Sequence, residues 1–202
     1  MNSTLPTDWK LSPLGELARV YSGGTPSRNV SAYWGGTIPW VTTAEIDSGH
    51  ITSTRQTITD SGLKASAARI AQPGTILLAM YGQGKTRGKS ALLGIAATMN
   101  QACAAIETSS KLDPRYLLYY LSWQYDTIRS MSNAGSQDNL SGEIVREIPI
   151  AVPTMPEQCA IAEALDDASS EINLFERLIV KKQAVMQGIM QQLLTGRTRL
   201  PG

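Results

Sequence analysis

The octet at residues 79–86, Ala-Met-Tyr-Gly-Gln-Gly-Lys-Thr, carries side chains that could bind phosphate. It matches the G-x-x-x-x-G-K-[ST] pattern of nucleotide-binding loops, except that Ala79 occupies the first glycine position. In such a loop, backbone N–H groups surround the phosphates, Lys85 reaches the β- and γ-oxygens, and the Thr86 hydroxyl holds Mg²⁺. The apolar run at residues 75–80 predicts the buried strand that leads into a loop of this kind.

The residues after Thr86 favour a different chemistry. A phosphate loop opens into a helix whose N-terminus completes the anion site, whereas Gly88 and Gly94 bracket any helix here and glycine disfavours helix. The competing interpretation is a glycine-containing hairpin loop with Lys85, Arg87 and Lys89 at alternate positions. Because alternate residues of a strand share a face, we expect the three charges to point together toward one polyanion.

Length and charge narrow the possible classes of protein. The 202 residues suit one domain, with or without an appendage, and the net charge is only +1, so a nucleic-acid site must be local. No apolar run approaches the roughly 18 residues of a membrane span. Cys103 and Cys159 lie far apart and not in metal-ligand spacing. We therefore expect a cytoplasmic protein with reduced thiols, no membrane segment and no metal site.

Residues 1–153 have the pattern of a mixed α+β domain. Short strands with β-branched residues are expected, together with one helix that Asp113 caps and Pro114 begins. The helix should bury Leu117, Leu118, Leu121 and Ile128. The strands are expected near residues 38–42, 51–54, 75–80, 95–106 (one or two strands) and 148–152.

Residues 154–202 predict a single long helix. Thr154 and Glu157 fit a capping box, and the helix should stop at 195–196, about 40 residues and 60 Å later. Apolar residues alternate in steps of three and four, with Lys182 in the one missing slot, which is typical of a coiled coil. A helix lying on its own domain is the alternative, but the length favours a protruding arm. The expected seam is Ile161, Leu165, Ala168, Ile172, Phe175, Ile179, Met186, Ile189 and Leu193.

The sequence offers little for catalysis. His50, the single histidine, lies in a turn, so triads and metal clusters built on histidine are excluded. The one acid-x-Lys triplet, Asp8-Trp9-Lys10, lacks the Pro-Asp that common Mg²⁺ nucleases place before it. A base methyltransferase would show a glycine-rich cofactor loop and an Asn/Asp-Pro-Pro-aromatic loop, and neither is present. We expect a noncatalytic protein that binds and positions.

Ordered along nearly the whole chain, a set of short motifs resembles the specificity subunit of type I restriction–modification systems. Each motif is weak alone, and their order and spacing carry the resemblance. They are Trp9 with Leu14-Gly15-Glu16-Leu17, Ser22-Gly23-Gly24-Thr25-Pro26-Ser27-Arg28, Tyr33-Trp34-Gly35-Gly36 with Ile38-Pro39-Trp40, Ile58-Thr59 with Gly62-Leu63, Asn100-Gln101-Ala102, Gly135-Ser136-Gln137 with Asn139-Leu140, Ile148-Pro149-Ile150 with Pro153, Glu157-Gln158 with Ile161-Ala162, and Gln192-Leu193-Leu194-Thr195-Gly196.

The resemblance implies a DNA-recognition subunit. Target-recognition domains of this family each read one half of an interrupted site in double-stranded DNA, and long helices act as a spacer and docking surface for methylation subunits. Those subunits bind S-adenosylmethionine, and a restriction subunit that consumes ATP joins them. S-adenosylmethionine, ATP and Mg²⁺ are thus expected on partners, and no cofactor on this chain.

Typical members carry two recognition domains and two helical regions, whereas this chain has one of each and no internal repeat. We expect a half-subunit, natural or truncated, with a target-recognition domain at 1–153 and a helical region at 154–202. The helical region is expected to dimerise and to dock the methylation subunits. We expect two copies to associate through residues 157–194 as a homodimer, and pairing with another specificity chain is the alternative.

The DNA-contacting candidates follow from the resemblance and from side-chain chemistry. Lys85 and Lys89 suit phosphates, Arg87 suits a guanine edge, and the amides suit base edges, above all adenine. Two alternatives remain at this point: a phosphate-loop NTPase, and an assembly protein built on the coiled coil that does not bind DNA. The candidates are Thr25, Ser27, Arg28, Thr43, Tyr81, Gln83, Lys85, Arg87, Lys89, Gln101, Ser136, Gln137 and Asn139.

Overall fold

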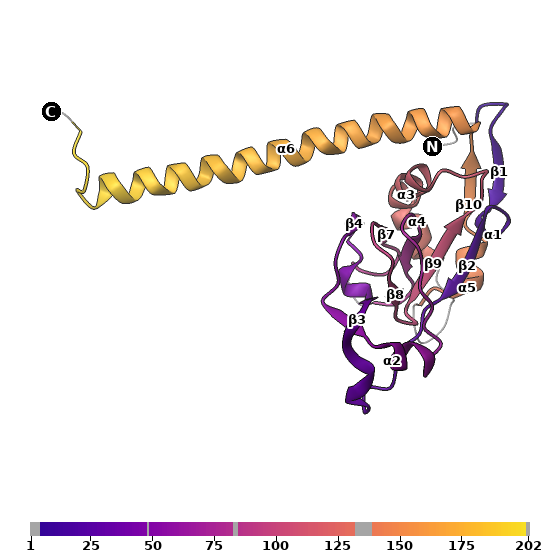
Figure 1. Ribbon diagram of the computed structural model, residues 1–202. Helices are drawn as coiled ribbons and strands as arrows, with labels where there is room; N and C mark the ends of the chain where they lie inside the picture. Colours follow the sequence, from indigo (N-terminus) through magenta and orange to yellow (C-terminus); the bar gives the residue numbers. More distant parts are fainter. Residues whose placement is uncertain (1–4, 48, 83–84, 132–138, 201–202) are drawn as a thin grey trace. The chain divides into compact units, whose positions relative to one another are not determined.

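The computed structural model describes residues 5–47, 49–82, 85–131 and 139–200. Two compact units emerge from the contacts, Met1–Ala160 and Ile161–Gly202 (Figure 1). The first is a mixed sheet and helix unit, and the second is helical. The sequence placed a boundary after residue 153, at the start of the long helix. The contacts group the first turns of that helix, up to Ala160, with the globular unit.

A five-stranded sheet forms the centre of the globular unit, in the order β2-β9-β6-β7-β4. Its neighbours pair antiparallel except β4 and β7, which are parallel. Every residue of β6 and β7 is buried, so the continuous apolar run at 75–80 does form the buried strand that it predicts. The strands are β2 Ala18–Ser22, β4 His50–Ile51, β6 Ile76–Ala79, β7 Ser90–Leu93 and β9 Cys103–Thr108.

Two smaller sheets complete the unit. The first has the order β5-β3-β8, and its own small core contains Trp40, Ile58 and Ala68. The second pairs β1 with β10, the strand that immediately precedes the long helix. Their strands are β3 Trp34–Val41, β5 Gln56–Ile58, β8 Thr98–Met99, β1 Lys10–Pro13 and β10 Pro149–Val152.

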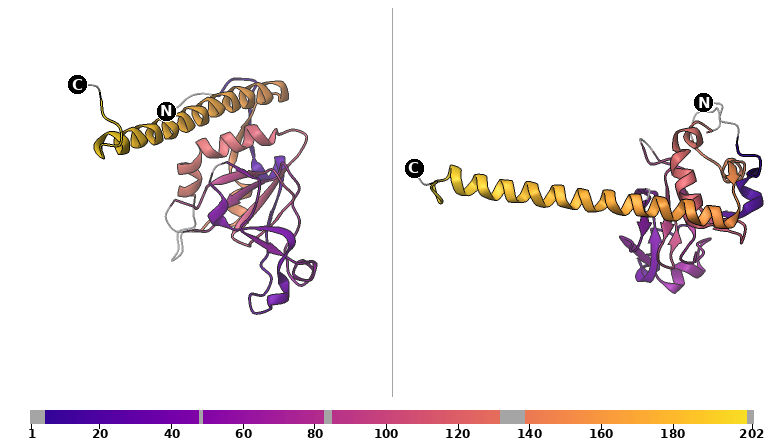
Figure 2. Two further views of the ribbon diagram at one scale, coloured as in Figure 1. Left: turned by 60° about the vertical axis from the view of Figure 1, so that its left-hand side comes forward. Right: turned by 90° about the horizontal axis from the view of Figure 1, so that it is seen from above.

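The predicted capped helix is present but divided. Asp113 accepts hydrogen bonds from the backbone N–H groups of Arg115 and Tyr116, as an N-cap should. The helix buries Leu117, Leu118 and Leu121 and packs against β7, and Figure 2 shows it beside the sheet from two further sides. It ends at Gln124, and a second helix then buries Ile128. These helices are α3 Pro114–Trp123 and α4 Tyr125–Ser130.

The expectation of one helix before residue 154 was therefore wrong. Three further short helices, each of four or five residues, are too short to show a periodic pattern. Two carry a side-chain cap, since Thr59 accepts from Gly62 N–H and Ser141 from Ile144 N–H. The expected strand at 51–54 is also shorter, ending at Ile51. The remaining elements are α1 Leu14–Leu17, α2 Asp60–Lys64, α5 Gly142–Arg146 and the 3-10 turns η1 Ser31–Tyr33 and η2 Thr43–Glu45.

The long helix, α6 Met155–Leu194, has the predicted length of 40 residues. It begins directly after Thr154, the expected cap, and it ends before Gly196, whose φ of +69° is the left-handed conformation that glycine adopts at helix ends. Glu157 accepts a hydrogen bond from the Trp9 indole at 3.3 Å. Within the part of the chain that the structure describes, no helix is long and apolar enough to cross a membrane.

Candidate nucleic-acid interface

Several strands of the globular unit begin or end at one common edge. The pairings there are Ser22 with Ala104, Val41 with Met99, Leu78 with Ser90 and Ala79 with Cys103. The ends of β2, β3, β6 and β8 thus meet the starts of β7 and β9. The connecting segments 23–30, 42–45, 80–82, 85–89 and 100–102 all leave from this edge, and we call them the loop edge.

Backbone hydrogen bonds join these segments to one another. The stretch 99–102 is central, because it bonds to the glycine segment, to β3 and to the start of the hairpin. Residues 139–140 join as well, through the hydrogen bond from Leu140 N to Met80 O at 3.0 Å. The three central bonds run from Gly24 N to Met99 O (2.9 Å), from Asn100 N to Val41 O (2.9 Å) and from Met80 N to Ala102 O (2.8 Å).

The predicted DNA-contacting residues therefore gather from distant parts of the sequence. The predicted residues within the described ranges lie on the loop edge or, for Asn139, directly beside it. Ser27, Arg28, Tyr81, Lys85 and Gln101 are exposed. Thr25, Thr43, Arg87, Lys89 and Asn139 are half-buried. Gln83, Ser136 and Gln137 were predicted too, but they lie outside the described residues.

Two glycines let the first segment approach the sheet closely. A Cβ atom on Gly23 would lie 2.2 Å from Met99 O, and one on Gly24 would lie 2.4 Å from Ala68 N. Any side chain at either position would therefore displace backbone. The close approach also lets the buried indole of Trp40 donate to Gly24 O at 3.0 Å. The Gly-Gly pair thus fixes where Thr25 and Arg28 lie.

Arg28 lies against two tryptophan rings. Its guanidinium carbon is 3.7 Å from the ring centroid of Trp34 and 4.8 Å from that of Trp40. Arg28 Nη1 also donates to Gln56 Oε1 at 2.7 Å, and the Trp34 indole donates to Ser27 O at 3.1 Å. An exposed cation is thereby held in one orientation by stacking and by an amide. Gln56 was not among the predicted residues, since it comes from β5 and no local pattern links it to Arg28.

The hairpin between β6 and β7 differs from the expected strand with basic residues at alternate positions. Residues 85–89 form a turn closed by the hydrogen bond from Lys89 N to Thr86 O at 3.1 Å, and Gly88 has a φ of +86°. The left-handed residue reverses the chain, so Lys85, Arg87 and Lys89 lie on a turn and do not alternate along one strand. Lys85 is exposed, whereas Arg87 and Lys89 are half-buried.

The same hairpin excludes the phosphate-loop interpretation. The chain continues from Gly88 directly into strand β7 at Ser90, where a phosphate loop needs a helix. Without that helix there is no N-terminal dipole to complete an anion site behind Lys85 and Thr86. The basic hairpin loop is the interpretation that the structure supports.

The loop edge is locally basic although the whole chain is nearly neutral. Segments 23–30, 80–89 and 100–102 contain Arg28, Lys85, Arg87 and Lys89 and no Asp or Glu. Glu45, in segment 42–45, accepts from Thr42 N and Arg55 N at 2.8 Å each, so its carboxylate is occupied in holding that turn. A concentration of positive charge at one edge suits a polyanion such as DNA.

Two side chains with reactive groups, Cys103 and His50, lie in different places: Cys103 begins β9 at the loop edge, whereas β4 with His50 pairs with the other end of β7. Cys103 is buried, and burial, with a smaller effect of the Glu45 charge, raises the pKa of its thiol to about 12. The thiol donates to Asn100 Oδ1 at 3.1 Å and so stays protonated at neutral pH. His50 is exposed at the start of β4. Among the described residues, no three His, Cys, Asp or Glu side chains group as metal ligands would.

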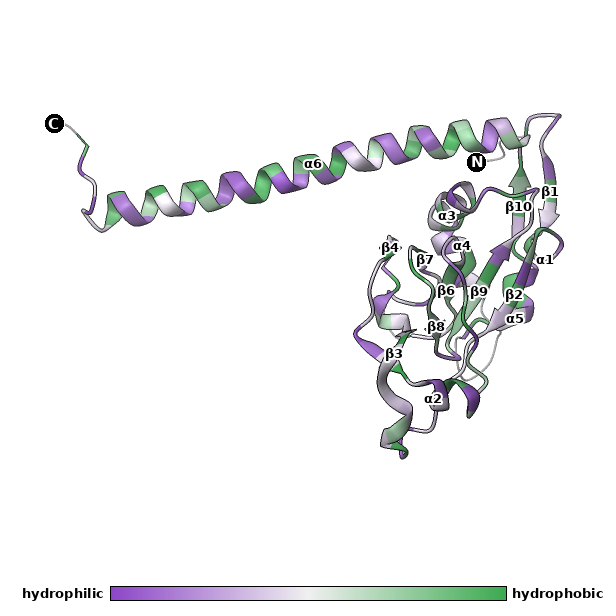
Figure 3. Cartoon of the chain, viewed as in Figure 1, coloured by the Kyte–Doolittle hydropathy of each residue, from purple (hydrophilic) through white to green (hydrophobic). Residues whose placement is uncertain are grey.

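The seam of α6 is largely exposed along the helical unit. Figure 3 shows apolar and polar bands alternating along this helix. Ile172 and Phe175, in the middle of the predicted seam, expose 59% and 60% of their surface. Leu165, Ala168, Ile179, Met186 and Ile189 are exposed as well, and Ile161 and Leu193 are half-buried. Leu178 and Val185, beside the seam, are also exposed, so the apolar stripe is wider than predicted.

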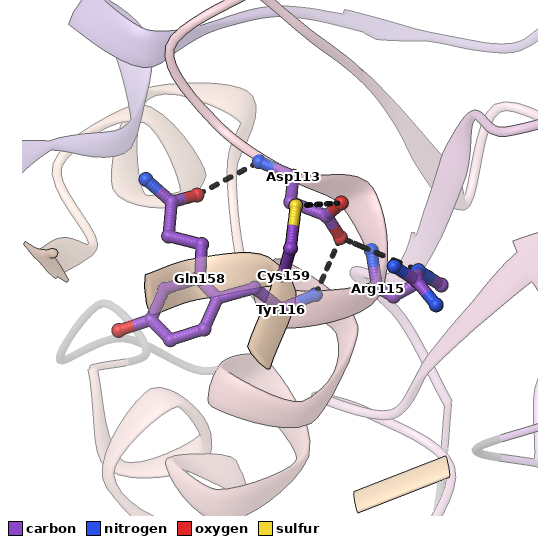
Figure 4. Close-up of polar contacts among 5 residues, drawn as sticks. All are labelled: Asp113, Arg115, Tyr116, Gln158 and Cys159. Atoms are coloured by element: carbon purple, nitrogen blue, oxygen red, sulfur yellow. Dashed lines mark hydrogen bonds and ion pairs between the residues drawn. The ribbon is translucent and has the colours of Figure 1, made fainter. Parts of the chain in front are cut away.

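The first turns of α6 are tied into the globular unit by a buried glutamine (Figure 4). Gln158 Oε1 accepts from Asp113 N at 2.8 Å, and Gln158 Nε2 donates to Lys111 O at 3.1 Å and to Pro153 O at 3.0 Å. The Cys159 thiol points at Asp113, with Sγ 3.7 Å from Oδ2. One side chain of α6 therefore joins the cap of α3 to the end of β10.

Comparisons with known proteins show the family to which this chain is similar. The family model described as "Type I restriction modification DNA specificity domain" matches residues 6–181. The MjaIX specificity subunit of Methanocaldococcus jannaschii is 28% identical over 80% of this chain and 38% of its own length. The EcoR124I/EcoR124II specificity subunit of Escherichia coli is 28% identical over 79% of this chain and 40% of its own length. The chain thus spans about two fifths of the length of these relatives.

Solved structures show the same fold. The HsdS subunit from Thermoanaerobacter tengcongensis matches with a TM-score of 0.68 and 20% identity, covering 95% of this chain and 46% of that one. A chain from a study of assembly and conformational transition of the type I R-M system matches with a TM-score of 0.75 and 20% identity, covering 94% and 45%. The matched part of each of these structures therefore shares the α+β sheet domain followed by a long helix. Since the family model matches most of its length, the chain belongs to the type I restriction–modification DNA specificity family.

Proposed function

We propose that this chain is a sequence-specific DNA-recognition half-subunit that reads one half of a bipartite target. The observation that carries the proposal is the loop edge. Candidate residues from five segments meet there, and the segments are locally basic in a nearly neutral chain. Membership of the specificity family supports the same function, and the NTPase and non-DNA-binding alternatives lack such support.

Within the loop edge, we assign roles by chemistry and exposure. Lys85 and Lys89 contact phosphates, which position the protein without reading sequence. Arg28, held on Trp34, and Arg87 are the arginines suited to a guanine edge, and Gln101 and Asn139 are the amides suited to adenine. Thr25 donates to Gln101 Oε1, so the orientation of that amide is already set.

The helix α6 is proposed as the assembly element. Its exposed seam supports pairing with a second helix, either of another copy or of a second specificity chain. Leu178 and Val185, beside the seam, supply further apolar surface on which methylation subunits can dock. A restriction subunit joins the same complex. S-adenosylmethionine, ATP and Mg²⁺ then act on the partners, and this chain is noncatalytic. The two free cysteines suit a cytoplasmic location.

Selection from random DNA tests the proposal. The full chain with its cognate methylation subunits is incubated with a pool of random duplexes, and bound molecules are sequenced over several rounds. Enrichment of a motif with two short specified blocks separated by a fixed number of unspecified bases supports the proposal. A pool that stays random after selection contradicts it. A titration with a fluorescent ATP analogue gives the parallel test, and saturable micromolar binding abolished by Lys85→Ala would restore the NTPase alternative.

A further inference from the structure

Helix α4 hydrogen-bonds to the backbone of the basic hairpin at residues 85–89. The Tyr125 hydroxyl donates to the backbone carbonyl of Lys85 at 2.7 Å, across 40 positions in the sequence. Arg129, one turn further along α4, directs Nη1 to the Tyr125 hydroxyl at 3.1 Å and to the carbonyl of Arg87 at 3.3 Å. Two residues of α4 thus engage carbonyls on both sides of Thr86.

The chemistry of these groups fixes the direction of every bond. A carbonyl only accepts, so the Tyr125 hydroxyl proton must point to Lys85 O. The lone pairs of that hydroxyl are then the acceptor for Arg129, and the second proton on Nη1 serves Arg87 O. Hydrogen bonds linked in this way strengthen one another, because each bond polarises the next.

Three further backbone hydrogen bonds hold the hairpin. Gly88 N donates to Ala79 O at 2.9 Å, Ala79 N donates to Lys89 O at 2.9 Å, and Lys89 N donates to Thr86 O. The carbonyls of Lys85, Thr86, Arg87 and Lys89 therefore each have a partner. A Cβ atom on Gly88 would lie 3.6 Å from the Tyr125 ring, so the aromatic face also lies against the turn. These contacts tie residues 85–89 to α4 and to β6, and the Lys85 side chain stays exposed.

We propose that Tyr125 and Arg129 are positioning residues for DNA recognition, which act by setting the conformation of residues 85–89 before DNA binds. This inference rests on the proposed function. Non-specific binding needs only positive charge near phosphates, whereas specific binding needs the charges at defined places. A preset loop avoids the ordering cost at the moment of binding. Loosening the loop should therefore weaken specific binding and leave non-specific binding unchanged.

The test compares Tyr125→Phe with Tyr120→Phe. Tyr120, on α3, also donates from its hydroxyl to a backbone carbonyl, that of Pro149 at 3.3 Å, so the control loses the same kind of bond elsewhere. Arg129→Lys is the second variant, which keeps the charge but cannot serve both acceptors in the same geometry. The full chain with its methylation subunits is titrated against a duplex carrying the selected motif and a scrambled duplex of equal length.

Tyr125→Phe and Arg129→Lys are expected to weaken binding to the motif duplex about fivefold to tenfold, the effect of about one hydrogen bond, with scrambled-duplex binding within twofold of wild type. Tyr120→Phe should change neither. If Tyr125→Phe does not fold, Arg129→Lys carries the test alone. Equal loss on both duplexes, or wild-type discrimination in both α4 variants, overturns the inference. A wild-type chain that does not distinguish the duplexes contradicts the proposed function itself.

Discussion

At the scale of single residues, the basic side chains at and near the loop edge differ in how far other residues orient them. Arg28 lies on Trp34 and bonds to Gln56, and Arg129 serves the hairpin backbone. The Lys85 side chain is exposed, with only its carbonyl engaged by Tyr125. Under the proposed function, its exposure makes Lys85 the first candidate phosphate ligand of the hairpin, and the half-buried Lys89 is the second.

Replacing either lysine should reduce DNA affinity without changing specificity. Lys85→Ala or Lys89→Ala removes one phosphate contact, so binding to all duplexes should weaken alike. The slope of log affinity against log salt concentration should fall by about one unit. Lys111→Ala is the matched control. Lys111 is also exposed, but it follows the end of β9, whereas the loop edge lies at the start of that strand. The slope is measured from dissociation constants taken at salt concentrations between about 50 and 200 mM. An unchanged slope in both hairpin variants would remove their phosphate role.

At the scale of elements, Gln158 joins three parts of the globular unit through one buried amide. Gln158→Leu keeps the approximate volume but leaves Asp113 N–H and two carbonyls without their partner. Buried groups left unpaired cost about 1–3 kcal/mol each, and relaxation recovers part of this, so we expect a loss of about 3 kcal/mol. Gln72→Leu, at an exposed turn, should cost less than about 0.5 kcal/mol.

Denaturant unfolding followed by tryptophan fluorescence measures both variants. All 4 tryptophans lie within residues 9–123, so the signal reports the globular unit alone. Equal unfolding midpoints for Gln158→Leu and Gln72→Leu would show that the buried amide does not stabilise the first turns of α6.

The elements also show what the sequence can and cannot predict. The long helix, its glycine stop, the Asp113 cap and the buried strand before the hairpin are local patterns, and the structure confirms them. The short helices α1, α2 and α5 escaped prediction because four or five residues carry no period. The shape of the 85–89 turn was not predicted, because it depends on the left-handed conformation of Gly88 and on contacts with α4. The contact between Tyr125 and Lys85 spans 40 positions, so no local spacing indicates it.

The candidate site was predictable only in part. Resemblance to a family supplied Thr25, Arg28 and Gln101, and the structure then brings those segments to one edge. The sequence could not predict which of these residues hydrogen-bond or stack with other residues of the chain. The partners of Arg28 come from β3 and β5, and those of the hairpin come from α4, so only the folded chain shows them.

At the scale of the whole molecule, the exposed seam of α6 predicts association. Ile172→Asp places a charge in the apolar seam of each helix, which costs several kcal/mol when that seam is buried against a partner. We expect the dissociation constant of the dimer to rise roughly a hundredfold or more. Ser170→Asp adds the same charge two residues away, at an outer heptad position, and should leave the dimer intact.

Sedimentation equilibrium of the full chain measures this association. A tight dimer that survives Ile172→Asp unchanged would show that α6 is not the interface. A monomer at all concentrations would instead favour pairing with a different specificity chain.

The central claim, that this chain selects a DNA sequence, is tested most directly by methylome sequencing. Cells receive this chain as the only specificity subunit, together with its cognate methylation subunits, and are compared with cells that receive the methylation subunits alone. Two copies paired through α6 would each read the same half-site, as two-fold proteins match two-fold targets. The account predicts methylation at an interrupted palindrome with an unread spacer of fixed length, present only when this chain is present. Methylation that does not depend on this chain, or a continuous motif without a spacer, would contradict it.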